Sequence, residues 1–167
     1  VQASGLGAAL DPDAADIYYI GGGQDRDQRQ CAYDLVEVKR DAPHAAAARG
    51  AVILAVCGGY QLLGHRYQLG EEALPGVGLV DLETVRADGP RLIGNVAIEV
   101  ELEPGTRRVL AGFENHGGRT ILGPAATPLG RVLNGHGNNG RDGHEGVRTR
   151  NVIGTYLHGP LLPKNAW

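Results

Sequence analysis

The residues with the clearest chemical meaning surround Cys57. The apolar run at residues 51–56 ends there, and Gly58 and Gly59 follow before a helical pattern resumes. A strand that turns sharply into a helix needs small neighbours, because the residue at the turn takes a strained conformation that lifts its side chain clear of the sheet. The pattern predicts a cysteine nucleophile, with the N–H of Gly58 facing an oxyanion. The alternative is a buried structural cysteine, against which the two glycines argue.

A cysteine nucleophile needs a base, and His158 is the best-placed histidine. It follows the strand-like run at 151–157, and Gly159-Pro160 then forces a turn. Functional groups gather at the carboxyl ends of strands in an open α/β sheet, so Cys57 and His158 are expected to meet in space. His116 is the rival base, or else a substrate ligand or a turn residue. The remaining histidines, which show no zinc-type spacing, are His44, His65, His136 and His144.

Three consecutive glycines, Gly21, Gly22 and Gly23, follow another predicted strand. They lack the spacing of a dinucleotide-binding or P-loop motif, and neither motif occurs elsewhere in the sequence. We therefore expect no nucleotide site in this chain. Bare backbone N–H groups at a strand end can bind an oxyanion or a substrate, and a simple turn is the plainer alternative.

The elements that must position these groups follow from the apolar pattern. Residues 16–20 and 51–56 are predicted strands, and the second reads as a strand buried on both faces, as in a parallel sheet. Helices are expected at 24–40, 42–49 and 58–67. Strands and helices that alternate in this way predict an α/β layered fold with a mostly parallel sheet.

The second half of the chain is richer in short β-type segments. Strands are expected at 77–80, 92–100 and 131–133, separated by Gly and Pro turns. The Gly/Asn-rich stretch 135–146 is expected to be an exposed, mobile loop. Cys31, in the middle of the first predicted helix, has no glycine beside it and is expected to pack in the core.

Length and composition limit the remaining possibilities. The chain has 167 residues and a net charge of −3, with no basic cluster, which disfavours a dedicated nucleic-acid binder. No apolar run is long enough to span a bilayer, and two cysteines make no disulfide framework, so a reducing, cytoplasmic setting is expected. We expect one domain over 1–167, trimmed at both ends, because the chain starts at Val1 and ends at Trp167.

These features in this order resemble the class I glutamine amidotransferases. The match is to the CobB/CobQ-like subgroup, and most closely to the glutaminase subunits of lipid II isoglutaminyl synthases. The segments that carry the resemblance are 19–25, 57–64, 112–120 and 156–165. The resemblance implies a three-layer, flavodoxin-like α/β fold with a mostly parallel sheet and a nucleophile elbow.

The resemblance also implies a reaction. In it, Cys57 attacks the side-chain amide of glutamine, and His158 acts first as base and then as the acid that protonates the leaving ammonia. Water then hydrolyses the glutamyl thioester to glutamate.

The same resemblance suggests the substrate-binding residues. Gln61 matches a family position that contacts glutamine, and Gly22 or Gly23 is expected to form the oxyanion hole with Gly58. Arg91 is the candidate for the α-carboxylate of glutamine, a task that suits a fixed cation. A solvated surface arginine is the alternative for Arg91.

A synthetase partner is implied as well. It is expected to be a Mur-ligase-like subunit of the MurT type, which binds ATP and Mg²⁺ and activates the α-carboxyl of D-glutamate in the stem peptide of lipid II. Ammonia from the glutaminase would then give D-isoglutamine. No cofactor and no metal are expected in the chain itself, and no direct membrane insertion.

Two departures from the family pattern matter. Many class I amidotransferases carry a glutamate two residues after the histidine, where this chain has Pro160. Either Cys57 and His158 suffice, or Glu114 substitutes, or the partner supplies an acid, and the last is favoured. The family also begins with a strand and a helix that this sequence lacks, so an unpaired sheet edge is expected.

Other functions stay open at this point. The ammonia acceptor could be a different one, such as cobyrinate. A non-catalytic subunit that only binds glutamine or a partner is a further alternative, and the presence of both Cys57 and His158 argues against it. A cysteine peptidase on the same fold is disfavoured, because Gln61 and the segment around Arg91 suit glutamine better.

Overall fold

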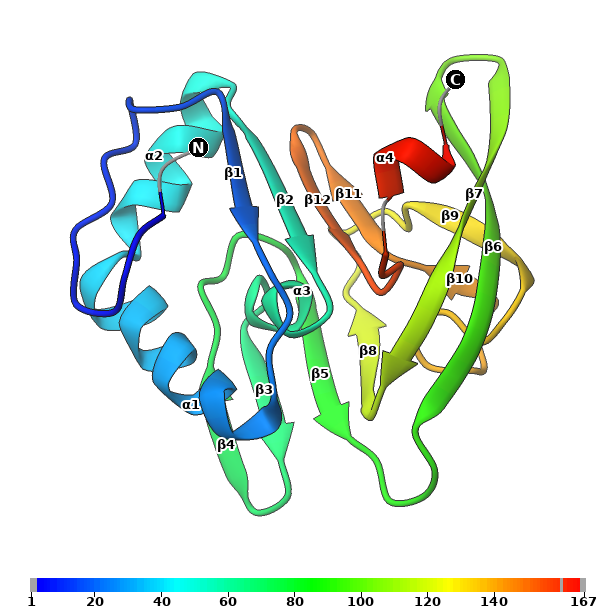
Figure 1. The fold of residues 1–167 in the computed structure, drawn as a ribbon, viewed down its shortest axis with the longest axis horizontal. Helices are drawn as coiled ribbons and strands as arrows, with labels where there is room; N and C mark the ends of the chain where they lie inside the picture. The colour runs from blue at the N-terminus through cyan, green and yellow to red at the C-terminus, as the bar shows by residue number, and fades with distance from the viewer. Residues whose placement is uncertain (1–2, 160, 166–167) are drawn as a thin grey trace.

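Three four-stranded sheets and a few short helices make up the part of the chain that the computed structural model describes, residues 3–159 and 161–165 (Figure 1). The sheet that matters for function has the order β1-β2-β12-β11. Its strands are β1 (Ile17–Ile20), β2 (Val52–Val56), β12 (Val152–Thr155) and β11 (Val147–Thr149).

Strands β1, β2 and β12 run parallel, and β11 is antiparallel to β12. Ile20 pairs with Ala55, and Thr155 pairs with Val56, so the three parallel strands end at about the same level. The segments that follow them therefore emerge at one edge of the sheet. β1 pairs only with β2 among the described residues, which leaves its outer edge open, as expected from the sequence.

Helices connect β1 to β2 and set the position of the first glycine segment. They are α1 (Asp25–Tyr33), a π-helical turn η1 (Asp34–Val38) and α2 (Asp41–Arg49). α2 packs through Ala46 and Ala47 onto the core that includes Ile53 of β2. It ends at Gly50, whose φ of 103° is the left-handed conformation that glycine adopts readily.

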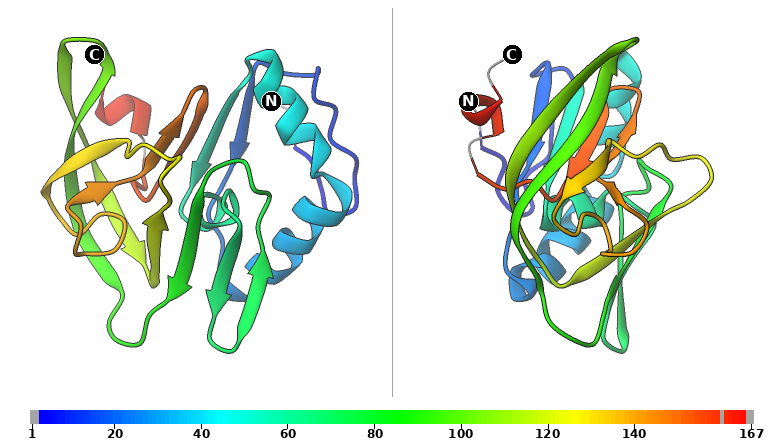
Figure 2. Two further views of the ribbon diagram at one scale, coloured as in Figure 1. Left: turned by 180° about the vertical axis from the view of Figure 1, so that it is seen from behind. Right: turned by 90° about the vertical axis from the view of Figure 1, so that its right-hand side faces the viewer.

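The other two sheets are largely antiparallel. One contains β6 (Leu92–Glu103), β7 (Thr106–His116), β9 (Gly130–Asn134) and β10 (His144–Glu145), and Figure 2 shows its long twisted β6–β7 hairpin. The other contains β3 (Arg66–Leu69), β4 (Glu72–Pro75), β5 (Leu82–Arg86) and β8 (Gly118–Leu122). Two short helices complete the fold, α3 (Gly58–Leu62) after β2 and α4 (Leu161–Lys164) near the C-terminal end. No helix in the described ranges is long and apolar enough to cross a membrane.

Most predicted elements are present, and the parallel arrangement is confirmed for the strands around Cys57. The helix predicted at 58–67 is wrong beyond Leu62. The chain there packs too closely to stay helical, because a Cβ on Gly64 would lie 2.3 Å from the carbonyl oxygen of Leu82. Residues 66–69 instead form β3, which buries Tyr67 and pairs with β4 and β5.

The strand predicted at 77–80 is also absent. The backbone N–H groups of Val77 and Leu79 bind the carbonyl oxygens of Leu62 and Leu63, so this apolar segment closes the C-terminal end of α3. Cys31 is exposed rather than packed in the core, and its neighbour Ala32 is the buried residue of that turn.

The Gly/Asn-rich stretch 135–146 is not simply an exposed loop. Asn138 and Glu145 have no exposed surface. The Asn138 side chain accepts a hydrogen bond from the Tyr60 hydroxyl at 3.0 Å and pairs with both backbone groups of Gly146. The stretch therefore folds back onto the core. The buried Asn138 side chain provides hydrogen-bond partners for the backbone N–H and C=O of Gly146, which are buried with it.

Candidate active site

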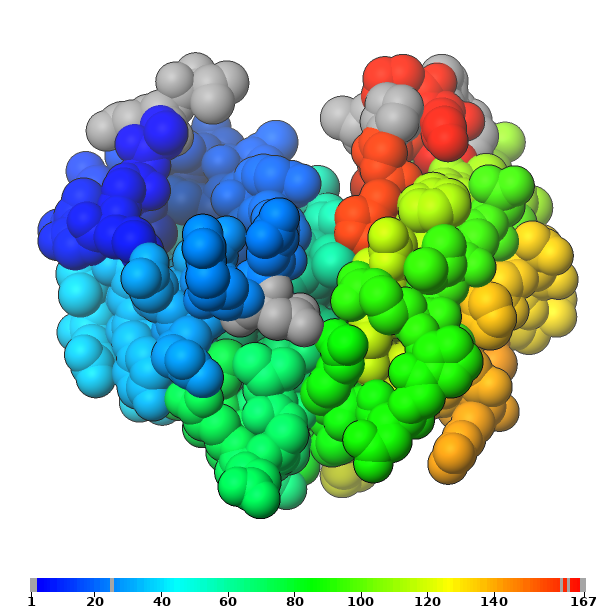
Figure 3. Space-filling model, turned by 60° about the horizontal axis from the view of Figure 1, so that its bottom comes forward, coloured from blue at the N-terminus to red at the C-terminus, as the bar shows by residue number. Residues whose placement is uncertain are grey.

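A pocket of about 720 Å³ opens where the parallel strands end. It separates the β1–β2 edge from β7 and the C-terminal segment, and Figure 3 shows the molecule hollowed between its blue N-terminal part and its red C-terminal part. The lining residues with polar side chains are Tyr19, Cys57, Arg91, Asn115 and His158, and the apolar ones include Leu54, Val56, Phe113, Leu157 and Leu161.

Cys57 sits at the sharp turn that the sequence predicts. β2 ends at Val56, α3 begins at Gly58, and Cys57 between them has φ 53° and ψ −109°. A positive φ is costly for a residue with a side chain and persists only where the surroundings impose it. Two backbone bonds impose it here, from Cys57 N–H to the oxygen of Thr155 at 2.9 Å and from the N–H of Gln61 to the Cys57 oxygen at 3.0 Å.

The neighbouring glycines allow this turn to pack. A Cβ on Gly59 would lie 2.3 Å from the carbonyl oxygen of Ile20, so α3 passes directly against the end of β1. A Cβ on Gly22 would lie 3.1 Å from the Cys57 Cβ, and one on Gly58 would lie 3.2 Å from the backbone nitrogen of Gly23. The glycine segment after β1 and the cysteine turn after β2 are therefore in close contact, as an oxyanion site made from both requires.

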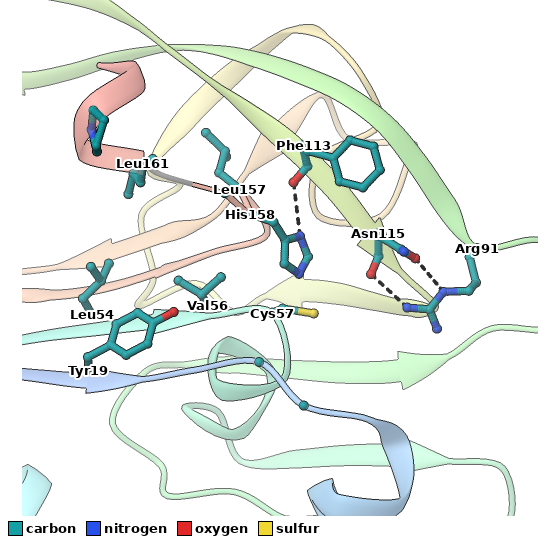
Figure 4. A pocket seen from close by; sticks show the side chains of 14 residues that line it. Tyr19, Leu54, Val56, Cys57, Arg91, Phe113, Asn115, Leu157, His158 and Leu161 are labelled. Carbon is teal, nitrogen blue, oxygen red and sulfur yellow. Dashed lines mark hydrogen bonds between the residues drawn. The ribbon is translucent and has the colours of Figure 1, made fainter. Parts of the chain in front are cut away.

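His158 lies just beyond β12 on the opposite wall of the pocket. Its Nδ1 donates a hydrogen bond to the carbonyl oxygen of Phe113 at 3.1 Å, and backbone bonds join the same two residues in both directions. In Figure 4 the other edge of the imidazole faces the Cys57 side chain. Burial lowers the pKa of His158 below its usual 6.5, although the Phe113 carbonyl opposes this shift. This shift favours the neutral imidazole at pH 7, and because Nδ1 carries the proton given to Phe113, Nε2 is the basic nitrogen.

Arg91 is exposed at the end of the pocket beyond the cysteine, where two hydrogen bonds to Asn115 orient it. Its Nε donates to the Asn115 side-chain oxygen and one terminal nitrogen donates to the Asn115 carbonyl, both at 2.8 Å (Figure 4). Guanidinium carries five N–H donors, so these two bonds orient it and leave others for a ligand. The predicted fixed cation therefore lines the same pocket as Cys57 and His158.

Gln61 and His116, which were also predicted to bind substrate, lie outside the pocket lining. Gln61 is buried; it accepts a hydrogen bond from Gln28 at 2.6 Å and donates one to the Tyr156 hydroxyl at 3.2 Å. His116 is 1% exposed and stacks on Tyr156 with ring centres 3.5 Å apart. Both residues contact Tyr156, which lies two residues before His158, and so they pack behind the pocket rather than in it.

Glu114 does not replace the missing carboxylate beside His158. It is completely buried and accepts bonds from the ring and the backbone of His136, both at 2.7 Å, and from the N–H of Gly137 at 2.9 Å. Burial by itself would raise the pKa of Glu114. The hydrogen bonds from His116, His136 and Gly137 lower the pKa by more than burial raises it, so the pKa of Glu114 lies below its usual value. None of the described contacts of this carboxylate is with His158. Pro160, on which the sequence argument rests, lies outside the described residues.

Sequence reasoning missed the residues that hold the site together. Phe113 and Asn115 orient His158 and Arg91, and Tyr19 and Leu54 line another wall of the pocket. Asn115 lies between two buried residues of β7, Glu114 and His116. Successive side chains of a strand point to opposite faces, and this alternation is the one sequence signal that Asn115 faces the pocket. In the described ranges no cluster of three His, Cys, Asp or Glu side chains could hold a metal ion.

Comparison with curated proteins gives close relatives. The chain is 42% identical over 154 residues to a Staphylococcus aureus protein named lipid II isoglutaminyl synthase (glutamine-hydrolyzing) subunit GatD, covering 92% of this chain and 60% of the relative. It is 40% identical to the protein of the same name from Streptococcus pneumoniae, covering 94% of this chain and 59% of the relative. A cobyric acid synthase of Pelotomaculum thermopropionicum is 35% identical over 71% of this chain, which matches 25% of that protein.

The chain thus spans about 60% of the length of the GatD relatives it matches. Among solved structures, a glutamine amidotransferase matches with a TM-score of 0.65 at 18% identity, covering 87% of this chain and 71% of that one. PurLQS from Thermotoga maritima matches with a TM-score of 0.60 at 20% identity, covering 93% and 73%. Both show the same fold. The model of the CobB/CobQ-like glutamine amidotransferase domain matches residues 2–166, and the chain belongs to that family.

Proposed function

We propose that this chain carries the glutaminase centre of a lipid II isoglutaminyl synthase. One observation carries the proposal: Cys57, strained at the end of a parallel strand, shares a pocket with a neutral His158 and a fixed guanidinium, Arg91. A thiol, a base and a cation are what the hydrolysis of a side-chain amide in an amino acid requires.

The proposed chemistry starts with transfer of the Cys57 thiol proton to His158 Nε2. The thiolate attacks the side-chain carbonyl carbon of glutamine, and the resulting oxyanion accepts hydrogen bonds from the N–H of Gly58 and of Gly22 or Gly23. When the intermediate collapses, the carbon–nitrogen bond breaks and His158 returns its proton to the leaving ammonia. Water, activated by the same histidine, then cleaves the thioester and releases glutamate.

Arg91 binds the α-carboxylate of glutamine in this proposal. A planar guanidinium matches a carboxylate better than a lysine ammonium does, because it offers two parallel donors. The bonds to Asn115 leave the cation in one orientation, which fixes the distance between the bound carboxylate and Cys57. Gln61 and His116 act from behind the pocket rather than on the substrate.

The acceptor and the partner rest on the GatD relatives, which are named as glutamine-hydrolysing subunits. We propose a Mur-ligase-like partner of the MurT type, which binds ATP and Mg²⁺ and amidates the D-glutamate of the lipid II stem peptide. The Phe113 carbonyl orients His158 but carries no charge, so a partner carboxylate remains the candidate to stabilise the imidazolium. If each partner acid near the docked site can be mutated without loss of glutamine hydrolysis, that role for the partner is excluded.

The proposal is tested by glutamate release from glutamine. The full-length protein is assayed with and without the synthetase, and Cys57→Ala is compared with Cys31→Ala as the matched control, since Cys31 is exposed and is not among the residues that line the pocket. We expect activity to disappear in Cys57→Ala, to persist in Cys31→Ala and to rise with the synthetase. Equal activity in wild type and Cys57→Ala would refute the proposal. If the complex amidates cobyrinate instead of the stem peptide, the glutaminase chemistry stands and the acceptor is different. A folded complex without activity would indicate a non-catalytic subunit.

A further inference from the structure

The outer edge of β7 carries the segment that contains His158. β7 lies at the end of its sheet, where β6 occupies one edge. Ala111 and Phe113 are two residues apart, so their N–H and C=O groups point to the same, outer edge. At Phe113 that edge is occupied by His158, through backbone bonds of 3.3 and 2.7 Å. The position of the imidazole is therefore set by how this segment lies along β7.

Asn165 occupies the next place on the same edge. Its side-chain oxygen accepts a hydrogen bond from the N–H of Ala111 at 2.9 Å, and its side-chain nitrogen donates to the Ala111 carbonyl at 3.2 Å. The carboxamide thus pairs with Ala111 as the peptide group of a neighbouring strand would. The same nitrogen donates to the carbonyl of Leu161 at 2.6 Å, which ties the residue to the start of α4.

These bonds form a closed frame. His158 pairs with Phe113, Asn165 pairs with Ala111, and between them the N–H of Leu161 binds the oxygen of Gly159 at 2.8 Å. Figures 1 and 2 show α4, inside this frame, beside β7, and the two elements are in contact.

Gly159 is the reason why the segment needs the Asn165–Ala111 bonds in addition to the bonds between His158 and Phe113. It follows His158 with a φ of 96°, in the region that glycine adopts without strain, and a Cβ there would meet only the end of the Lys164 side chain. A free glycine hinge next to a catalytic ring would let the ring move. The Asn165 bonds hold the far side of that hinge on the strand that also accepts the hydrogen bond from His158 Nδ1.

We infer that Asn165 is a positioning residue, which keeps the His158 imidazole in register with Cys57 by anchoring the segment after it to Ala111 of β7. The inference rests on the proposed function. Asparagine suits the task because it presents one donor and one acceptor in the plane of a peptide group. Aspartate at the same place would keep the acceptor for the Ala111 N–H and lose the donor for the Ala111 carbonyl.

The test uses the full-length protein with its synthetase and the variants Asn165→Ala and Asn165→Asp. The matched control is Asn134→Ala, because Asn134 also donates its side-chain amide to a strand carbonyl, that of Asn95 at 3.0 Å, from β9 on the other side of β6 from β7. We expect kcat for glutamine hydrolysis to fall by about tenfold or more in both Asn165 variants, since small misplacement of a catalytic group has effects of this size. KM for glutamine should change by less than about twofold, because Arg91 is untouched.

A second measurement separates positioning from loss of structure. Burial lowers the pKa of His158, and the titratable and charged groups that face this ring, Cys57, His116 and Arg91, are the same in every variant. If the ring is released into solvent, the acid limb of the kcat–pH profile should move to higher pH in Asn165→Ala and stay in place in Asn134→Ala. An effect that only reflects unfolding lowers the active fraction and leaves the profile unchanged.

Three results would overturn the inference: wild-type kcat in Asn165→Ala, an unshifted acid limb, or the same loss in Asn134→Ala. If Asn165→Ala does not fold, kcat and the acid limb are measured for the nearly isosteric Asn165→Asp, and the same results would overturn the inference. Failure of the proposed function is distinguishable, since Cys57→Ala would then be as active as wild type, and the inference would fall with it. An inactive Cys57→Ala beside a fully active Asn165→Ala would overturn this inference alone.

Discussion

The Nδ1 atom of His158 lies 3.1 Å from the carbonyl oxygen of Phe113. A backbone carbonyl therefore does here what a carboxylate does in a Cys–His–Glu triad: it fixes the tautomer and directs Nε2 toward the thiol. A carbonyl carries no net charge, so it opposes the effect of burial on the imidazole only weakly, and the pKa of His158 stays below 6.5. The site is thus built to hold a neutral base.

This pKa direction predicts the acid limb of the pH profile. His158 must be neutral to accept the thiol proton, and its protonated form is disfavoured until the pH falls below 6.5. We expect kcat/KM for glutamine, measured without the synthetase, to fall to half of its maximum only below pH 6.5. Steady-state rates between pH 5 and 8 test this, and a half-maximal rate above pH 6.5 would contradict it.

Arg91 is predicted to control substrate binding. Arg91→Lys removes both bonds to Asn115 and the parallel donors, so KM for glutamine should rise by about tenfold or more, with a smaller change in kcat. The matched control is Arg66→Lys, because Arg66 pairs with Glu83 on the surface. An unchanged KM in Arg91→Lys would show that another group binds the α-carboxylate.

The glycines beside Cys57 should respond differently to alanine. A Cβ on Gly22 would lie 3.1 Å from the Cys57 Cβ, which is tighter than an ordinary van der Waals contact, whereas one on Gly23 meets nothing within 4 Å. Gly22→Ala crowds the nucleophile and is expected to lower kcat by about tenfold or more. Gly23→Ala keeps its N–H and should stay within about threefold of wild type. Glutaminase kinetics and melting temperatures of both variants test this, and equal effects would contradict the close contact between Gly22 and the Cys57 turn.

Glu145 is predicted to make stability depend on pH. It is completely buried and accepts bonds from Thr155 and the N–H of Tyr156, yet burial raises its pKa to about 8 from 4.5. The folded state therefore binds a proton that the unfolded state loses above pH 4.5. This stabilisation is complete below pH 4.5 and is lost as the pH rises through about 8.

The test for Glu145 is chemical denaturation of wild type and Glu145→Gln at several pH values. The difference in the free energy of unfolding should change between pH 4.5 and about 8, by on the order of a few kcal/mol, because the glutamine variant does not titrate. A difference that is independent of pH would mean that Glu145 is ionised in the folded protein at neutral pH.

The sequence was sufficient where local pattern and chain geometry agree. The apolar run before Cys57 predicts a buried parallel strand, and the glycines around it predict the strained turn, because both follow from short-range sterics. His158 could be placed at the same sheet edge because its own strand runs parallel to β2. Of the site residues, Cys57 and His158 are the two whose positions follow from where their strands end.

The sequence was not sufficient where tertiary contacts decide. Gln61 lies in a helix that starts at the active cysteine, but its face turns toward Gln28 and Tyr156, away from the pocket. The helix around it stops early because Gly64 packs on Leu82, a contact between segments that no local pattern reveals. Asn165 acts on the backbone of a strand 54 residues away, so nothing near it in the sequence indicates its partner.

The central claim is that Cys57 forms a covalent bond to the glutamyl group of glutamine, and an acid-quenched reaction tests it directly. The full-length protein is mixed with glutamine, quenched within one turnover and examined by peptide mass spectrometry, with Cys31 as the internal control. The account predicts a mass increase of one glutamyl group on the Cys57 peptide, none on the Cys31 peptide, and none in Cys57→Ala. A glutamyl group on another residue, or glutamate release by Cys57→Ala at the wild-type rate, would contradict it.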